Sequence, residues 1–335
     1  MACCFQTKSD ALHESCKGSV PVTESKLQAC LTVQPCLSVQ SCPTVQPQGN
    51  GCRTVQPQEN VVQPQPQYTL DKVISKTLYG QVLRATRKIP HCLPAPCVIK
   101  MSSLTRMKLQ QNKENPREEA RILEYVSRKT VHPNIIQHVD QFVLDDNLYH
   151  VLEYFPGQEL FDYVVATKTG LTEAKAKIVF KQLISAVKFL HRRRVAHLDI
   201  SLENILIHPN SLHIKLIDFG AALILPSQCF DLIGFRGKLA YMAPETYAGQ
   251  KFNGLAADIY SCGTVLFLLL FAAPAYQIPA ESDPLFKRII SQNYHGRTYA
   301  HKQISDSAVS LLKSIIAPEQ KRCSLSDIEN HPWMQ

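Results

Sequence analysis

The stretch His197-Leu198-Asp199-Ile200-Ser201-Leu202-Glu203-Asn204 decides how the rest of the chain is interpreted. Fourteen residues after Asn204 the chain reads Asp218-Phe219-Gly220, and the two apolar runs in between, residues 205–207 and 214–217, are typical of short strands. The pattern predicts a loop, two strands joined by a turn, and a second loop, with a carboxylate or an amide in each loop. Phosphoryl transfer requires such groups, because one carboxylate must orient an attacking hydroxyl while other oxygens hold Mg²⁺ against nucleotide phosphates.

Taken together, the two loops resemble the catalytic loop and the metal-binding loop of the eukaryotic protein kinases of the serine/threonine type. The resemblance implies that Asp199 orients the substrate hydroxyl and that Asn204 and Asp218 are metal ligands, with ATP and Mg²⁺ as cofactors. It also implies a bilobal α+β fold. The small β-rich lobe would cover about residues 68–153, and the larger, mainly helical lobe about residues 157–335.

The first 67 residues differ in composition from the rest of the chain. Thr-Val-Gln-Pro recurs at 32–35, 44–47 and 54–57, and seven of the twelve cysteines lie in this part. Short copies rich in Gln and Pro cannot offset the entropy of ordering by burying apolar surface, so we expect a disordered tail over residues 1–67. The repeat cysteines form no Cys-x-x-Cys pair, which argues against a zinc site. Residues 68–335 are expected to form the kinase domain.

The charge balance gives little guidance on partners. The formal net charge is +8, from 36 basic and 28 acidic residues. This mild excess suits the binding of polyanionic ATP but is equally ordinary for a protein surface, so we expect no nucleic acid as partner. No apolar signal stretch precedes the tail, and we therefore expect an intracellular protein, cytoplasmic or nuclear. The oligomeric state is left open.

Residues 75–82, Ser-Lys-Thr-Leu-Tyr-Gly-Gln-Val, stand where the resemblance places the glycine-rich loop over the nucleotide. Only Gly80 and Val82 match that pattern, and Ser75 and Thr77 replace its first two glycines. Because glycine lets the backbone approach phosphates closely, the exchange predicts looser nucleotide binding.

Lys100 ends the apolar run Cys97-Val98-Ile99, which is typical of a strand that carries one ammonium to a buried site. The resemblance implies that this lysine contacts the α- and β-phosphates and pairs with a glutamate on the next helix. That helix is predicted from Pro116 to about Arg128, with proline in the first turn. Glu119 fits the partner best, and Glu118 is the reserve.

The resemblance places the adenine site where the lobes join. Leu152 would line its back, the backbone of Glu153-Tyr154-Phe155 would bond the base, and Glu159 stands at a ribose or substrate contact. The other residues that we expect around the nucleotide are Val98 and Leu206.

Two long helices are predicted in the large lobe. The first is capped by Thr172, and its apolar face is expected to hold Ile178, Leu183, Ile184, Val187 and Leu190. The second lies within the apolar run 258–273, which is too short and too rich in small residues for a membrane span of about twenty residues. The resemblance makes it a buried central helix, with Asp258 bracing the catalytic loop, and pairs Arg322 with Glu245.

Two departures from the family pattern concern the activation segment. Leu198 stands where an arginine would grip a phosphate on that segment, and Ser227 and Tyr241 carry the only side-chain hydroxyls between Gly220 and Ala243. We hypothesise that activity does not require phosphorylation of the segment.

A further departure concerns the catalytic cation. Ser201 stands where a lysine would offset the γ-phosphate charge, and Lys238 stands where a threonine would face that lysine. We hypothesise an exchange in which Lys238 supplies the ammonium and Ser201 the hydroxyl, because developing negative charge needs a nearby cation. The alternative is two unrelated losses in a weakening enzyme.

The sequence therefore predicts an ATP- and Mg²⁺-dependent serine/threonine kinase acting on proteins, with Glu159 and Glu203 attracting basic residues near the acceptor. One alternative is a pseudokinase, a nucleotide-binding or scaffold module, which the altered glycine loop favours. The motif residues that oppose this alternative are Lys100, Asp199, Asn204 and Asp218. A small-molecule phosphotransferase of similar fold is disfavoured by the peptide-docking motif at residues 241–245.

Overall fold

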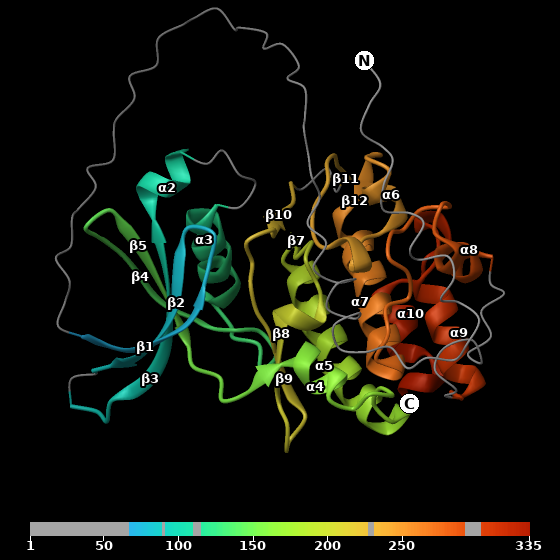
Figure 1. Cartoon of the computed structure of the whole chain (residues 1–335), viewed down its shortest axis with the longest axis horizontal. Coiled ribbons are helices and arrows are strands. Elements are labelled where there is room, and N and C mark those ends of the chain that lie inside the picture. Colours follow the sequence, from blue (N-terminus) through green and yellow to red (C-terminus); the bar gives the residue numbers. More distant parts are fainter. Residues whose placement is uncertain (1–66, 89–90, 110–114, 227–230, 292–302) are drawn as a thin grey trace, which may run out of the picture.

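The computed structural model describes residues 67–88, 91–109, 115–226, 231–291 and 303–335. These residues form two lobes side by side, a sheet with two helices on the left of Figure 1 and a helical body on the right. This is the bilobal protein kinase fold that the sequence predicts. The predicted disordered tail lies outside the described residues, apart from its last residue.

The small lobe is an antiparallel five-stranded sheet with the strand order β1-β2-β3-β5-β4. Its strands are β1 (Tyr68–Lys76), β2 (Gly80–Arg87), β3 (Ala95–Ser103), β4 (His138–Leu144) and β5 (Asn147–Glu153), and its helices are α2 (Leu104–Leu109) and α3 (Pro116–Ser127). Alternate residues of the three central strands form a small apolar core that includes Leu83, Ile99 and Val151. Helix α3 begins as predicted, with Pro116 in its first turn and the Asn115 side chain accepting from the Arg117 amide.

The large lobe is built around two long helices, α5 (Glu173–Arg192) and α7 (Gly254–Phe271). Its other helices are α4 (Leu160–Val165), α6 (Pro244–Tyr247), α8 (Pro284–Ile290), α9 (Asp306–Ile315) and α10 (Leu325–Asn330). By length and composition α7 could cross a membrane, but 89% of it is buried inside the fold. It is therefore the predicted central core helix.

Short strands line the junction between the lobes and the face of the large lobe. They are β6 (Gln158–Glu159), β7 (Val195–Ala196), β8 (Ile205–His208), β9 (His213–Leu216), β10 (Leu223–Ile224), β11 (Asp231–Leu232) and β12 (Phe252–Asn253). The β8–β9 hairpin is the predicted pair of strands, and its register sets Ile205 opposite Leu216. Because residue 204 precedes one strand and residue 217 follows the other, the hairpin brings the catalytic loop beside Asp218. The Ile217 amide donates to the Asn204 carbonyl at 2.9 Å.

Two details of the sequence-based prediction are wrong. Ile178 is 48% exposed, and Val179 and Phe180 are buried in its place. At 3.6 residues per turn, Ile178 lies about 140° around the helix from Leu183, which is on the core face. The apolar pair Ile135-Ile136 also predicts a strand, but these residues form none, since Ile135 makes only a single bridge to Leu216.

Candidate active site

A cavity of about 830 Å³ lies between the two lobes and is lined by side chains from both. It contains almost all the residues predicted to surround a nucleotide, namely Ser75, Thr77, Val82, Val98, Lys100, Leu152, Glu153, Phe155, Glu159 and Leu206. It also contains Asp199, Asn204 and Asp218, together with Glu119 and Lys238. The structure therefore brings the predicted site residues together, although they are spread over more than 160 positions of the chain.

Gly80 is the predicted nucleotide contact that does not line this cavity. A Cβ at Gly80 would stand 2.0 Å from the carbonyl oxygen of Met101, so the glycine is required by the close packing of β2 on β3. The Gly80 amide donates to Thr77 Oγ1 at 3.1 Å, and the Thr77 amide donates to the Gly80 carbonyl at 3.0 Å. Thr77 thus closes the hairpin turn above the cavity in place of a glycine.

Lys100 links the two lobes. Its Nζ lies 2.6 Å from Glu119 Oε1 on α3 and 3.3 Å from Asp218 Oδ1 in the loop after β9. Burial works against the ammonium, but the two carboxylates outweigh it and raise the pKa of Lys100. Burial likewise opposes ionisation of Asp218, yet Lys100 and the Gly220 amide hold the pKa of that carboxyl below its ordinary value. The reserve candidate Glu118 instead lies on the surface, 3.4 Å from Arg121.

The catalytic loop is held by one buried carboxylate, as predicted. Asp258, which is 1% exposed, accepts from the amides of His197 and Leu198, both at 2.8 Å. Its Oδ2 also lies 3.0 Å from His191 Nε2 at the end of α5. These bonds fix a loop in which Leu198 has a left-handed backbone conformation with a φ of 62°.

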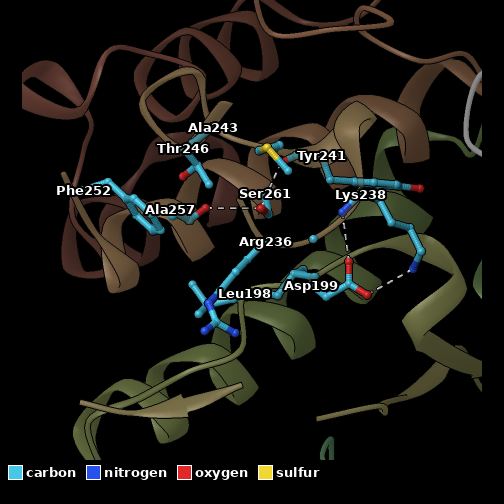
Figure 2. Close-up of a pocket in the computed structure, with 13 residues that line it drawn as sticks. Leu198, Asp199, Arg236, Lys238, Tyr241, Ala243, Thr246, Phe252, Ala257 and Ser261 are labelled. Carbon is cyan, nitrogen blue, oxygen red and sulfur yellow. Dashed lines mark hydrogen bonds and ion pairs between the residues drawn. The ribbon is translucent and has the colours of Figure 1, made fainter. Parts of the chain in front are cut away.

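The carboxylate of Asp199 is oriented from two sides. Asn204 Nδ2 donates to Asp199 Oδ2 at 2.6 Å and to the Asp199 carbonyl at 2.9 Å. From the other side, the Lys238 amide donates to Asp199 Oδ1 at 3.2 Å (Figure 2). The carboxylate therefore faces the cavity in one defined orientation.

Lys238 and Ser201 are neighbours, as the exchange hypothesis requires. Lys238 Nζ lies 2.7 Å from Ser201 Oγ and 3.4 Å from Asp199 Oδ2, and 3.9 Å from Glu203 Oε2. Ser201 is fully buried beneath this ammonium. The approach depends on Gly237, where a Cβ would stand 2.5 Å from the Leu198 carbonyl oxygen.

Apolar packing replaces the arginine that is absent at residue 198. Leu198 is 7% exposed, and its Cδ2 lies beside Gly254 together with Leu232 Cδ1. Strand β11 pairs with β12, and Lys251 lies 2.7 Å from Asp231, so the activation segment is fastened to the start of α7. Tyr241 is 2% exposed, and its hydroxyl accepts from the Leu202 amide. Ser227 lies outside the described residues.

Sequence reasoning missed several cationic side chains near the site. Lys72, Lys76 and Arg84 line the cavity, and the Arg84 guanidinium stacks 4.9 Å from the ring centre of Tyr154. Arg84 follows Val82 by two residues in β2, so strand alternation alone places it on the same face. Arg236, in the activation segment, lines a smaller pocket beside Asp199 and was also missed.

The donor set fits a nucleotide with Mg²⁺. In the part of the chain that the structure describes, no three His, Cys, Asp or Glu side chains are grouped to hold a metal alone. Magnesium is usually bound by one or two protein oxygens plus substrate phosphates, rather than by an all-protein cage. Asn204 and Asp218 supply such oxygens at the cavity wall, beside the ammonium of Lys100.

A sequence model of the protein kinase domain matches residues 68–334. The chain belongs to the protein kinase family. It is 34% identical over 226 residues to serine/threonine-protein kinase SRK2F of Arabidopsis thaliana, covering 64% of this chain and 63% of that protein. It is 33% identical over 205 residues to an SNF-related serine/threonine-protein kinase of Homo sapiens, covering 61% and 26%. For the carbon catabolite-derepressing protein kinase of Secale cereale, the identity is 30% over 271 residues, covering 80% and 51%.

The kinase matches therefore span between 26% and 63% of the length of these relatives. They confirm the family that the catalytic loop predicts. They also agree with the serine/threonine branch, since these relatives carry that name or the name of a protein kinase.

Proposed function

We propose that this chain transfers the γ-phosphoryl group of ATP to serine or threonine hydroxyls of proteins. The observation that carries the proposal is the convergence of Asp199, Asn204, Asp218 and Lys100 on one cavity between the lobes. The formed Lys100–Glu119 pair adds support, because it fixes the ammonium that would contact the α- and β-phosphates.

Each residue has one role in the proposal. Asp199 orients the acceptor hydroxyl and accepts its proton, and Lys100, held by Glu119, positions the α- and β-phosphates. Asn204 and Asp218 hold Mg²⁺, which when bound offsets the negative charge of the phosphates. Most of the rate enhancement would come from positioning and charge stabilisation, with no covalent intermediate on the protein.

Lys238 is proposed as the cation that stabilises charge on the transferred group. Its ammonium faces the carboxylate that binds the acceptor and lines the same cavity. Ser201 is proposed as a positioning residue, because its buried hydroxyl lies 2.7 Å from Lys238 Nζ and limits where that ammonium can go. A cation next to the reacting groups stabilises developing negative charge more strongly in a partly desolvated site than in water.

The adenine ring would lie between Val82, Val98, Leu152 and Leu206, with Glu153 and Phe155 offering backbone groups. Glu159 would attract a basic residue of the substrate. Burial raises the pKa of Glu159, and the nearby Asp162 and Glu203 act in the same direction. A cationic side chain of the substrate there would offset the repulsion between these carboxylates. We also propose that the kinase domain covers residues 68–335 and that the protein is cytoplasmic or nuclear.

We also infer that the activation segment docks without a phosphate. Its contacts are the β11–β12 pair, the Lys251–Asp231 ion pair and the apolar packing of Leu198. Protein treated with phosphatase should keep its activity. Loss of activity on this treatment, reproduced by Ser227→Ala, would contradict the inference.

The test uses the full chain with γ-labelled ATP, Mg²⁺ and a mixed peptide library. Wild-type protein should label serine- or threonine-containing peptides, and Asp199→Asn should lower labelling at least a hundredfold while the melting temperature is unchanged. Lys287→Ala, remote from the cavity on α8, is the matched control. A wild-type protein that binds ATP but labels no peptide would favour the pseudokinase alternative.

A further inference from the structure

Arg236 is a half-buried cation without an anionic partner. It lies in the activation segment two residues before Lys238 and lines a pocket with Leu198 and Asp199. Among the described residues it makes no hydrogen bond and no ion pair. Figure 2 shows its side chain running beside Leu198, away from the Asp199 carboxylate, with no dashed line reaching its guanidinium. Burial lowers the pKa of Arg236, with no offsetting carboxylate.

Among the described residues, Asp199 is the one acidic side chain that lines this pocket; it is already engaged, and so are three acidic side chains of the segments that form the pocket. Asp231 pairs with Lys251, and Glu245 pairs with Arg322. Asp258 accepts backbone amides of the catalytic loop, and Asp199 accepts from Asn204 and Lys238. A half-buried guanidinium loses part of its hydration, and two parallel hydrogen bonds to an oxyanion compensate for that loss. The anion that completes this site therefore comes from outside the described fold.

The position of Arg236 indicates the source of the anion. The Cα atoms of residues 236 and 238 are at most about 7 Å apart, because an extended residue spans about 3.6 Å. Lys238 contacts Asp199 through both its amide and its ammonium. Because Asp199 orients the acceptor hydroxyl, Arg236 can contact a substrate side chain a few residues from that hydroxyl. In the described part of the activation segment the only side-chain hydroxyl is that of Tyr241, which is 2% exposed and already bonded. Ser227, the other hydroxyl of the segment, lies outside the described residues, so phosphatase treatment is needed to test for a phosphate on the segment.

We propose that Arg236 binds an oxyanion on the protein substrate, which is the side chain of an aspartate, glutamate or phosphorylated residue a few positions from the acceptor. The proposal rests on the proposed kinase activity and adds a substrate class to it. Glu159 and Arg236 would then select opposite charges on the two sides of the acceptor.

The experiment measures specificity and binding with the full chain. A peptide that the wild type phosphorylates is synthesised with alanine, aspartate, phosphoserine or lysine at each position within five residues of the acceptor. At one position, phosphoserine or aspartate should raise kcat/KM roughly tenfold over alanine, mainly through KM. Arg236→Gln should bring this ratio to about one, and Arg236→Glu should make lysine the preferred residue there. Lys287→Gln, which removes a cation on α8 that lines neither pocket, should leave the ratio unchanged.

Three results would overturn the proposal. The first is the absence of any position at which an anion is preferred, and the second is a preference that survives in Arg236→Gln. The third is an effect of Arg236→Gln that disappears when the enzyme is treated with phosphatase, which would assign the anion to this chain. Anisotropy of a labelled phosphopeptide reports binding without catalysis. A chain that phosphorylates nothing but still binds this peptide through Arg236 would therefore contradict only the kinase activity.

Discussion

Replacing Lys238 by methionine removes one ammonium from the catalytic cavity while keeping most of the side-chain length. Nζ of Lys238 lies 3.4 Å from Asp199 Oδ2, and the two side chains are 30% and 20% exposed. At an effective dielectric constant of about 20, two unit charges at this distance attract by roughly 5 kcal/mol. Most of this attraction is present before the reaction as well, and only the additional attraction to negative charge on the transferred group lowers the barrier. We therefore expect kcat to fall about 10²–10³-fold, as when one stabilising donor is removed from an active site.

The assay is steady-state phosphorylation of a peptide substrate at saturating MgATP, with folding checked by thermal unfolding. Lys287→Met is the control, because Lys287 lies on α8, lines neither pocket, and loses the same charge in this variant. Ser201→Ala should cost less than Lys238→Met, since it removes a bond that positions the ammonium but keeps the charge. A Lys238→Met protein that is folded and has near wild-type kcat would refute the exchange of cation and hydroxyl.

Two further predictions concern stability. Arg322→Met should lower the free energy of unfolding by about 3–5 kcal/mol in denaturant titrations, because it leaves the buried Glu245 carboxylate unpaired. Lys188→Met breaks the more exposed pair with Glu329 and should lower it by less than about 1 kcal/mol. Burial, with help from His138 and Lys100, lowers the pKa of His150 to about 3, so below about pH 6.5 the unfolded state binds a proton that the folded state excludes. The free energy of unfolding should therefore fall as the pH drops from about 6.5 toward 3, and this group contributes up to about 1.4 kcal/mol per pH unit. In His150→Gln the melting temperature should fall less steeply with decreasing pH. An unchanged slope would contradict this assignment.

The part of the site that the sequence predicts consists of residues fixed by local structure. Asn204 and Asp218 are joined by one hairpin, so their spacing alone specifies that they meet. Glu119 is preferred to Glu118 because the run Glu119-Ala-Arg-Ile-Leu123 resembles the family pattern of a glutamate followed by apolar residues, and the structure pairs Glu119 with Lys100.

The remaining features depend on contacts between distant segments. The role of Gly80 follows from the backbone of β3 some twenty residues later, which no local motif reveals. The Arg236 pocket exists because the activation segment packs on a catalytic loop 38 residues earlier, with Gly237 allowing the close approach. The error at Ile178 arose from a five-residue spacing to Leu183, which resembles helical periodicity only loosely.

The central claim is that Lys100 and Asp218 converge on one site for a nucleotide with Mg²⁺. The most direct test is calorimetric titration of the full chain with ATP, with and without Mg²⁺, alongside Lys100→Met and Asp218→Asn. The account predicts one saturable site whose affinity rises with Mg²⁺ in the wild type and falls at least tenfold in each variant, with most of the Mg²⁺ dependence lost in Asp218→Asn. Wild-type protein that binds no ATP in the presence of Mg²⁺, or variants that bind it as tightly as the wild type, would contradict the claim.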